Sequence, residues 1–307
     1  MSVVKSTRIM LLASVFSLPL GYAAKAADLI LYPEPFVEAP VDLTLPAVSG
    51  PNGKLELALG GLTDPESAIF RAAGSVSLPV GDAFGLQGDL AVQNVDGDWA
   101  VGGALHAFTR DPNAYLFGLT GGFVAVDGAT LAAIGPEAEL YLDRVSLEFW
   151  AGWAAVEYDD AMLEDDNGFF AFGDLAYYVT DDWRVSIGGA SVLGSEWLRL
   201  ATEYQFTDLS MPISGTAEFR AYDTGAYSAM IGIKGYFGDP GKSLIDRHRQ
   251  DDPQNRVLDL FGAASILTAT PEDAGEPVPS DFADNETGCL DAGFVWTFPG
   301  CEYPNEV

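Results

Sequence analysis

Residues 196–207 read EWLRLATEYQFT, and their side chains alternate between two chemical classes. One set is largely apolar and consists of Leu198, Leu200, Thr202, Tyr204 and Phe206, and the set between them consists of Arg199, Ala201, Glu203 and Gln205. Because successive side chains of a β-strand point to opposite faces, this stretch predicts a strand with one apolar and one polar face. Residues 145–156 repeat the pattern.

About twelve segments of this kind follow one another between residues 53 and 238, separated by turn signals such as Asp96-Gly97 and Asp127-Gly128. The predicted strands are 53–61, 68–80, 84–95, 98–110, 114–126, 129–142, 145–158, 168–179, 183–193, 196–207, 212–222 and 226–237. A tilted strand crosses a membrane in about 9–11 residues, so each segment is long enough for one crossing. Helical spacing of apolar residues is not sustained in this region.

A soluble exported β domain with a wet outer face would give the same alternation, so the period alone does not decide the architecture. Large aromatic residues near strand ends favour a membrane barrel, because they suit its two interfacial girdles: Trp99, Trp183, Trp197, Phe206 and Phe237. The polar face mixes small residues with both signs of charge, which suits an enclosed lumen. We therefore predict an all-β, antiparallel, up-and-down transmembrane β-barrel of about twelve strands.

The N-terminal residues resemble an export signal. Lys5 and Arg8 precede an apolar run from Ile9 to Leu20, and small residues follow. We expect a cleaved signal peptide over 1–26, a proline-rich periplasmic lead-in over 27–52, the barrel over 53–238 and an irregular periplasmic tail over 239–307. The formal charge of −30 argues against a nucleic-acid partner, because a surface this negative repels phosphate.

The run Tyr177-Tyr178-Val179-Thr180-Asp181-Asp182-Trp183-Arg184-Val185-Ser186 resembles a hairpin of the porin-like outer-membrane β-barrel proteins of Gram-negative bacteria. The strand that ends Gly232-Ile233-Lys234-Gly235-Tyr236-Phe237 resembles the terminal strand by which the barrel-assembly machinery recognises its clients. The resemblance covers about 53–238. It implies the fold, a location in the outer membrane and contact with lipid and lipopolysaccharide, and it names no substrate. Phe237 departs from the usual pattern because residues 239–307 follow it.

Charged residues on the polar face are the candidate functional set. The predicted lumen-lining residues are Lys54, Glu56, Arg71, Asp89, Glu137, Glu139, Glu148, Asp174, Arg184, Arg199, Glu203, Glu218, Arg220 and Lys234. Charges inside a barrel must be solvated or paired. The set therefore predicts either a small passive channel for ions or small solutes, or an ion-paired core. In the second case the barrel is a plugged anchor whose periplasmic tail binds a protein or cell-wall partner.

Two further groups of residues lie outside the predicted strands. The acidic loop residues Asp159, Asp160, Glu164, Asp165 and Asp166 could bind a divalent cation weakly, although a solvated loop is the preferred interpretation. Cys289 and Cys301 are expected to form a disulfide in the oxidising periplasm. We expect no other metal site and no cofactor.

Enzymatic function is disfavoured by the sequence. A barrel hydrolase needs a nucleophilic serine with a histidine base, and beyond the leader the chain has only His106 and His248. Ser75, Ser77 and Ser228 could share the lumen with His106, but active sites on membrane lipid usually open at the lipid-facing rim. A small passive channel is therefore the leading hypothesis.

Overall fold

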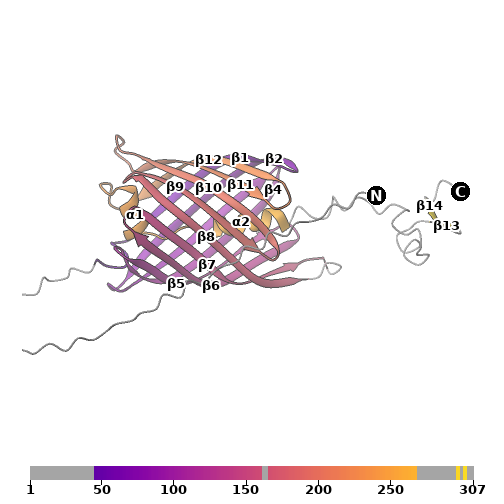
Figure 1. The fold of residues 1–307 in the computed structure, drawn as a ribbon, viewed down its shortest axis with the longest axis horizontal. Helices are drawn as coiled ribbons and strands as arrows, with labels where there is room; N and C mark the ends of the chain where they lie inside the picture. Colours follow the sequence, from indigo (N-terminus) through magenta and orange to yellow (C-terminus); the bar gives the residue numbers. More distant parts are fainter. Residues whose placement is uncertain (1–44, 161–164, 268–294, 298–299, 303–307) are drawn as a thin grey trace, which may run out of the picture. The chain divides into compact units, whose positions relative to one another are not determined.

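The computed structural model describes residues 45–160, 165–267, 295–297 and 300–302. Twelve antiparallel strands form one closed barrel in which each strand pairs with its sequence neighbours and β1 pairs with β12 (Figure 1). The strands are β1 (Asn52–Thr63), β2 (Glu66–Val80), β3 (Phe84–Val95), β4 (Asp98–Asp111), β5 (Tyr115–Val126), β6 (Ala129–Leu142), β7 (Val145–Tyr158), β8 (Asp166–Thr180), β9 (Trp183–Val192), β10 (Ser195–Phe206), β11 (Ile213–Tyr222) and β12 (Tyr227–Phe237). The predicted all-β barrel is confirmed.

Closure of the sheet depends on the register between the first and last strands. Gly53 pairs with Phe237 at one end of this seam and Leu62 pairs with Ser228 at the other. A closed sheet leaves no unpaired strand edge, which is the way a β-sheet can satisfy its backbone groups in lipid.

The two ends of the barrel have different turns. The termini-side mouth contains the start of β1, the end of β12 and the turns 81–83, 112–114, 143–144, 181–182 and 207–212. The distal mouth contains the turns 64–65, 96–97, 127–128, 159–165, 193–194 and 223–226. The predicted Asp96-Gly97 turn has φ of 50° and 115° at its two residues, which suits the tight hairpins that follow the twist of a sheet.

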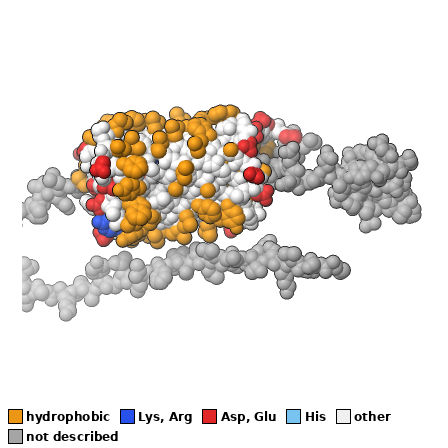
Figure 2. Space-filling model, turned by 90° about the horizontal axis from the view of Figure 1, so that it is seen from above, with side chains coloured by type: hydrophobic (Ala, Val, Ile, Leu, Met, Phe, Trp, Pro, Cys, Tyr) orange, Lys and Arg blue, Asp and Glu red, His pale blue; other side chains and the backbone are white. Residues whose placement is uncertain are grey.

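The outer wall of the barrel is apolar. Leu90, Leu105 and Ile231 are each more than 70% exposed. Figure 2 shows hydrophobic side chains along the wall, interspersed with backbone and small polar groups, and acidic groups at the two ends. Trp99, Trp183, Phe206 and Phe237 also face outward. Trp197 does not, because it shares the inward register of Arg199, and it is 5% exposed. Its assignment to the outer girdle was wrong.

Two helices follow the last strand where the sequence indicated an irregular tail. They are α1 (Leu244–Gln250) and α2 (Val257–Leu267), and a small hairpin of β13 (Val295–Thr297) and β14 (Gly300–Glu302) lies later in the chain. The Ser243 hydroxyl caps α1 by accepting the Asp246 backbone N–H at 3.3 Å. No helix in the described ranges is long and apolar enough to cross a membrane.

Candidate functional site: a lumen filled by the chain's own C-terminal segment

The lumen is filled by residues 244–267, which we call the lumen segment (Figure 1). It begins at the termini-side mouth, where the backbone N–H of Leu244 donates to Asp182 Oδ1 at 3.1 Å and that of Ile245 donates to the Asp181 carbonyl at 2.9 Å. Farther in, Lys54 Nζ donates to the Pro253 carbonyl at 2.7 Å. The segment is therefore bonded to the inner wall from its first turn onward.

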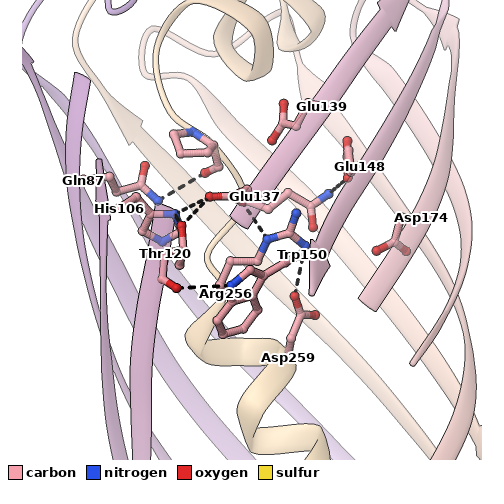
Figure 3. Close-up of polar contacts among 12 residues, drawn as sticks. Gln87, His106, Thr120, Glu137, Glu139, Glu148, Trp150, Asp174, Arg256 and Asp259 are labelled. Atoms are coloured by element: carbon pink, nitrogen blue, oxygen red, sulfur yellow. Dashed lines mark hydrogen bonds and ion pairs between the residues drawn. The ribbon is translucent and has the colours of Figure 1, made fainter. Parts of the chain in front are cut away.

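Arg256 joins the lumen segment to two strands of the wall (Figure 3). Its side chain is fully buried, and its Nε donates to Glu137 Oε1 at 2.7 Å. Its backbone N–H donates to Asp89 Oδ2 at 3.1 Å, and its Nη1 donates to Asp259 Oδ2 at 3.1 Å. A buried charge is tolerated only when it is paired and hydrogen-bonded, so this geometry fixes the segment in one position.

His106 completes the same cluster from β4. Its Nδ1 lies 2.7 Å from Glu137 Oε2 and its Nε2 lies 2.9 Å from Asp89 Oδ2, with the side chains fully buried. Each ring nitrogen of His106 therefore lies within hydrogen-bonding distance of a carboxylate oxygen from a different strand of the wall. Thr120 Oγ1 also donates to Glu137 Oε2 at 2.7 Å. His106 is thus held between two carboxylates. Ser77, one of the serines considered above as a nucleophile beside His106, donates its hydroxyl hydrogen to Gln87 Oε1 at 2.6 Å.

A second group of ion pairs lies across the lumen. Arg199 Nη1 donates to Asp259 Oδ1 at 3.0 Å, and Arg199 also pairs with Asp174 of the wall. Arg184 binds Glu148 at 2.8 Å, and the Gln254 side-chain amide donates to the same carboxylate. Asp259 therefore bridges arginines of two origins, Arg199 from the wall and Arg256 from the segment itself.

Toward the distal mouth the inner wall becomes apolar, and α2 packs against it. Val257, Leu260 and Phe261 are at most 1% exposed and belong to one hydrophobic cluster with wall residues. The aromatic wall residues of this cluster are Trp150, Phe170, Phe172, Trp197 and Tyr222, whose rings contact one another in sequence. The described side chains of α2 from Val257 to Ala264 are apolar apart from Asp259, and they are buried except for the half-buried Leu258, so the helix depends on the inner wall for its burial.

Glycines permit the close approach of α2 to the wall. A Cβ atom at Gly262 would lie 1.9 Å from Arg220 Nη1 and 3.3 Å from Trp197 Cζ2. A Cβ atom at Gly102 of β4 would lie 2.7 Å from Val257 Cγ2. A Cβ atom at either glycine would require the neighbouring side chain, Arg220 or Val257, to shift, so α2 and the wall pack closely here.

His248 of α1 lies between two tyrosines of the wall. Its Nδ1 is 2.9 Å from the Tyr178 hydroxyl and its Nε2 is 3.1 Å from the Tyr236 hydroxyl, which itself donates to Glu203 Oε1 at 2.5 Å. Burial lowers the pKa of the His248 imidazole well below its usual value, and the nearby Glu203 carboxylate only partly offsets this effect. His248 is therefore neutral when α1 is docked.

Little empty space remains around the lumen segment. A cavity of about 110 Å³ lies beside it, with Glu56, Arg71, Glu218 and Lys234 among its lining residues. This volume holds a few water molecules and no second stretch of chain. A second depression of about 360 Å³ lies at the distal mouth, and Phe261 and Ala264 line it together with Pro65, Asp96 and Asp127.

The structure places all fourteen predicted lumen residues on the inner face, where they are buried or half-buried. Most of them form ion pairs with one another or with the lumen segment, as in Arg71 with Glu56 and Lys234 with Glu203. Asp89 pairs with His106 instead, and Glu139 accepts a hydrogen bond from the Tyr141 hydroxyl at 2.8 Å. The sequence interpretation missed Asp252, Arg256 and Asp259, their partners from the segment. The signal available was an apolar eleven-residue run, VLDLFGAASIL, directly after a charged stretch.

The acidic loop and the cysteines lie at the limits of the described region. Asp159, Asp160, Asp165 and Asp166 are exposed, and Glu164 lies outside the described residues. Among the residues that are described, no group of three or more histidine, cysteine or acidic side chains is placed to hold a metal ion. Cys301 lies in β14 opposite Trp296, and Cys289 lies outside the described residues, so the disulfide stays a prediction.

Comparison with known proteins gives matches in structure. No protein-family model and no curated protein matches the sequence. Among solved structures, the chain is similar to a KdgM porin in complex with disordered oligogalacturonate, with 9% identity, a TM-score of 0.45 and coverage of 59% of this chain and 98% of that one. It is also similar to the NanC porin, with 11% identity, a TM-score of 0.46 and coverage of 59% and 98%. An outer-membrane protein OmpT of Vibrio cholerae matches with 12% identity, a TM-score of 0.36 and coverage of 61% and 98%.

These matches agree with the expected resemblance to porin-like outer-membrane barrels. Their identities and TM-scores are too low to carry substrate or mechanism over to this chain. The function is therefore argued from the chain's own residues.

Proposed function

We propose that this chain is an outer-membrane β-barrel that forms a passive pathway for ions or small solutes, and that its lumen segment closes this pathway. The apolar outer wall supports a membrane location, because a soluble protein rarely exposes a continuous apolar surface of this size. The predicted signal peptide supports export. The membrane environment would then be the lipid and lipopolysaccharide of the outer membrane, reached with the help of the barrel-assembly machinery.

The fully buried contact of Arg256 with Glu137 carries the proposal of a closed pathway. A charge-lined pore open to water would leave its charges solvated. Here the lumen charges pair with a segment that enters from the termini-side mouth, and α2 occupies the distal half of the lumen. Opening the pathway requires these ion pairs to separate and the segment to move.

The alternative is a permanently plugged barrel that serves as an anchor. The close fit of α2 at Gly102 and Gly262 favours this second candidate, since a helix packed this tightly resists displacement. In this case the function belongs to the residues beyond the barrel and to whatever protein or cell-wall partner they bind.

Conductance in a planar bilayer separates the two candidates. We expect the full chain to be closed for most of the recording, with rare openings, and a chain lacking residues 239–307 to conduct steadily. A full chain that shows no openings under any condition, together with a truncated chain that still folds and does not conduct, would overturn the channel and leave the anchor. The folded state of each variant is checked by its resistance to heat in detergent.

A further inference from the structure

The lumen segment has a direction, and it runs through the whole barrel. At its start, Ile245 is bonded to the Asp181 carbonyl in a turn of the termini-side mouth. At its end, Phe261 and Ala264 line the depression at the distal mouth together with Pro65, Asp96 and Asp127, which come from three turns of that mouth. The chain therefore enters the lumen at one mouth and reaches the other near the end of α2.

The N-terminal part of the described chain lies at the opposite end from the end of α2. The Ala47 backbone N–H donates to the Asp82 carbonyl at 2.8 Å, in the 81–83 turn of the termini-side mouth. The Ser49 N–H donates to the carbonyl of Gln250, the last residue of α1, at 2.9 Å. Residues 45–51 therefore approach β1 from the termini-side mouth, whereas α2 ends at the distal mouth.

The chain cannot return through the lumen after α2. Val257, Leu260 and Phe261 are buried against the wall in the distal half, and the cavity of about 110 Å³ beside the segment has no room for a second peptide strand. The described part of the segment therefore ends at the distal mouth, with the lumen behind it occupied.

Charge also favours continuation into solvent on that side. The described turns of the distal mouth and their flanking residues hold acids and no lysine or arginine: Asp64, Glu66, Asp96, Asp98, Asp127, Asp159, Asp160, Asp165, Asp166, Glu196 and Asp223. Residues 268–307 likewise contain acids and no lysine, arginine or histidine. Two surfaces of like charge repel, so the acidic segment is not drawn back onto the mouth.

We propose that the barrel displays its own C-terminal segment, from residue 268 onward, on the side of the membrane opposite its N-terminal lead-in. With the lead-in in the periplasm, the displayed segment lies at the cell surface and carries the hairpin of β13 and β14 with Trp296 and Cys301. The inference rests on the membrane location proposed above, and it holds whether or not the lumen ever conducts.

Site-directed labelling of intact cells tests this topology in the full-length chain. In a background with Cys289→Ser and Cys301→Ser, one variant carries Ser280→Cys and a matched variant carries Ala39→Cys in the lead-in. A maleimide that does not cross membranes is applied to intact and to permeabilised cells. We expect Ser280→Cys to be labelled equally in both, and Ala39→Cys to be labelled only after permeabilisation.

Three outcomes would overturn the proposal: labelling of the Ser280→Cys variant only after permeabilisation, labelling of both variants in intact cells, and labelling of the Ala39→Cys variant alone in intact cells. A second measurement guards against a misfolded variant. Protease added to intact cells carrying the unmodified chain should shorten it by the C-terminal segment and leave the heat-resistant barrel. A chain that keeps its full length under conditions that cleave other surface proteins contradicts the display. Bilayer conductance tests the channel separately, so each proposal can fail alone.

Discussion

Replacement of Arg256 by methionine should loosen the lumen segment while leaving the barrel wall intact. Arg256→Met keeps most of the side-chain volume and removes the buried guanidinium that binds Glu137 and Asp259. Removing one partner of a buried ion pair costs about 3–5 kcal/mol. Glu137 retains His106, and Asp259 retains Arg199, so we expect a value near the lower bound.

A loss of about 3 kcal/mol corresponds to roughly a hundredfold shift in the docking equilibrium, because each 1.4 kcal/mol is about tenfold. Single-channel recording measures this shift as the fraction of time for which the full-length pore conducts. The matched control is Arg144→Met, since Arg144 lies in the 143–144 turn of the termini-side mouth and makes an exposed pair with Asp181 at 2.9 Å. Exposed pairs contribute about 0–1 kcal/mol, so the control should record like the parent chain.

The double variant Arg256→Met with Glu137→Gln sharpens the test. If the two side chains act through their mutual contact, the effect of the pair on the open fraction is smaller than the product of the single effects. The explanation fails if Arg256→Met folds normally and its open fraction equals that of the Arg144→Met control. It also fails if the parent chain already conducts without interruption.

Three further predictions concern the fit, the pH response and the selectivity of the pore. Gly262→Leu should raise the open fraction, since its Cβ atom alone would lie 1.9 Å from Arg220 Nη1. The control Gly235→Ala should leave the open fraction unchanged, because no atom lies within 4 Å of a Cβ at that position. An open fraction that Gly262→Leu does not change would argue against the packing of α2. Because burial depresses the pKa of the docked His248, only the undocked state takes up a proton below about pH 6.5, so acidification should raise the open fraction. The increase in open fraction on acidification should vanish in His248→Gln. An equal increase in that variant would show that another titratable group causes it. The chain lacking residues 239–307 should prefer cations because its distal mouth is acidic, and a reversal potential of the opposite sign would contradict this.

The barrel could be predicted from sequence because its wall obeys a local rule. The predicted strand 84–95 coincides with β3 (Phe84–Val95), and the predicted 145–158 coincides with β7 (Val145–Tyr158). The inward and outward faces of each strand follow from the alternation in its own sequence, so no knowledge of distant contacts was needed. Trp197 was misassigned because its size and its place near a strand end were weighed above its register.

The closed lumen could not be predicted in the same way. Alternation identifies inward residues such as Glu137 and Asp89, but it does not identify the residues that they bind inside the lumen. Their partner Arg256 lies far away in the sequence, in a region whose charged and proline-containing texture suggested an irregular tail. The apolar helix α2 was also uninformative alone, because a short run of apolar residues has no periodicity that indicates its surroundings.

The inner face of the wall near the distal mouth carries large aromatic side chains. Trp150, Phe170 and Phe172 face inward, whereas the sequence analysis described the inner face by its small residues and its charges. These rings make sense only with α2 against them, since an empty lumen would expose them to water. An apolar patch on an otherwise polar inner face is therefore a useful signal of an internal plug.

A disulfide placed between the lumen segment and the wall would show most directly whether the segment fills the pore. Gly102→Cys with Val257→Cys, in a background with Cys289→Ser and Cys301→Ser, brings together two positions where the Gly102 Cβ would lie 2.7 Å from Val257 Cγ2. We predict that the bond forms under mild oxidation, changes the mobility of the unfolded chain, and abolishes openings until a reductant is added. Absence of the bond in a folded barrel, or undiminished conductance once it has formed, would contradict a lumen closed by residues 244–267.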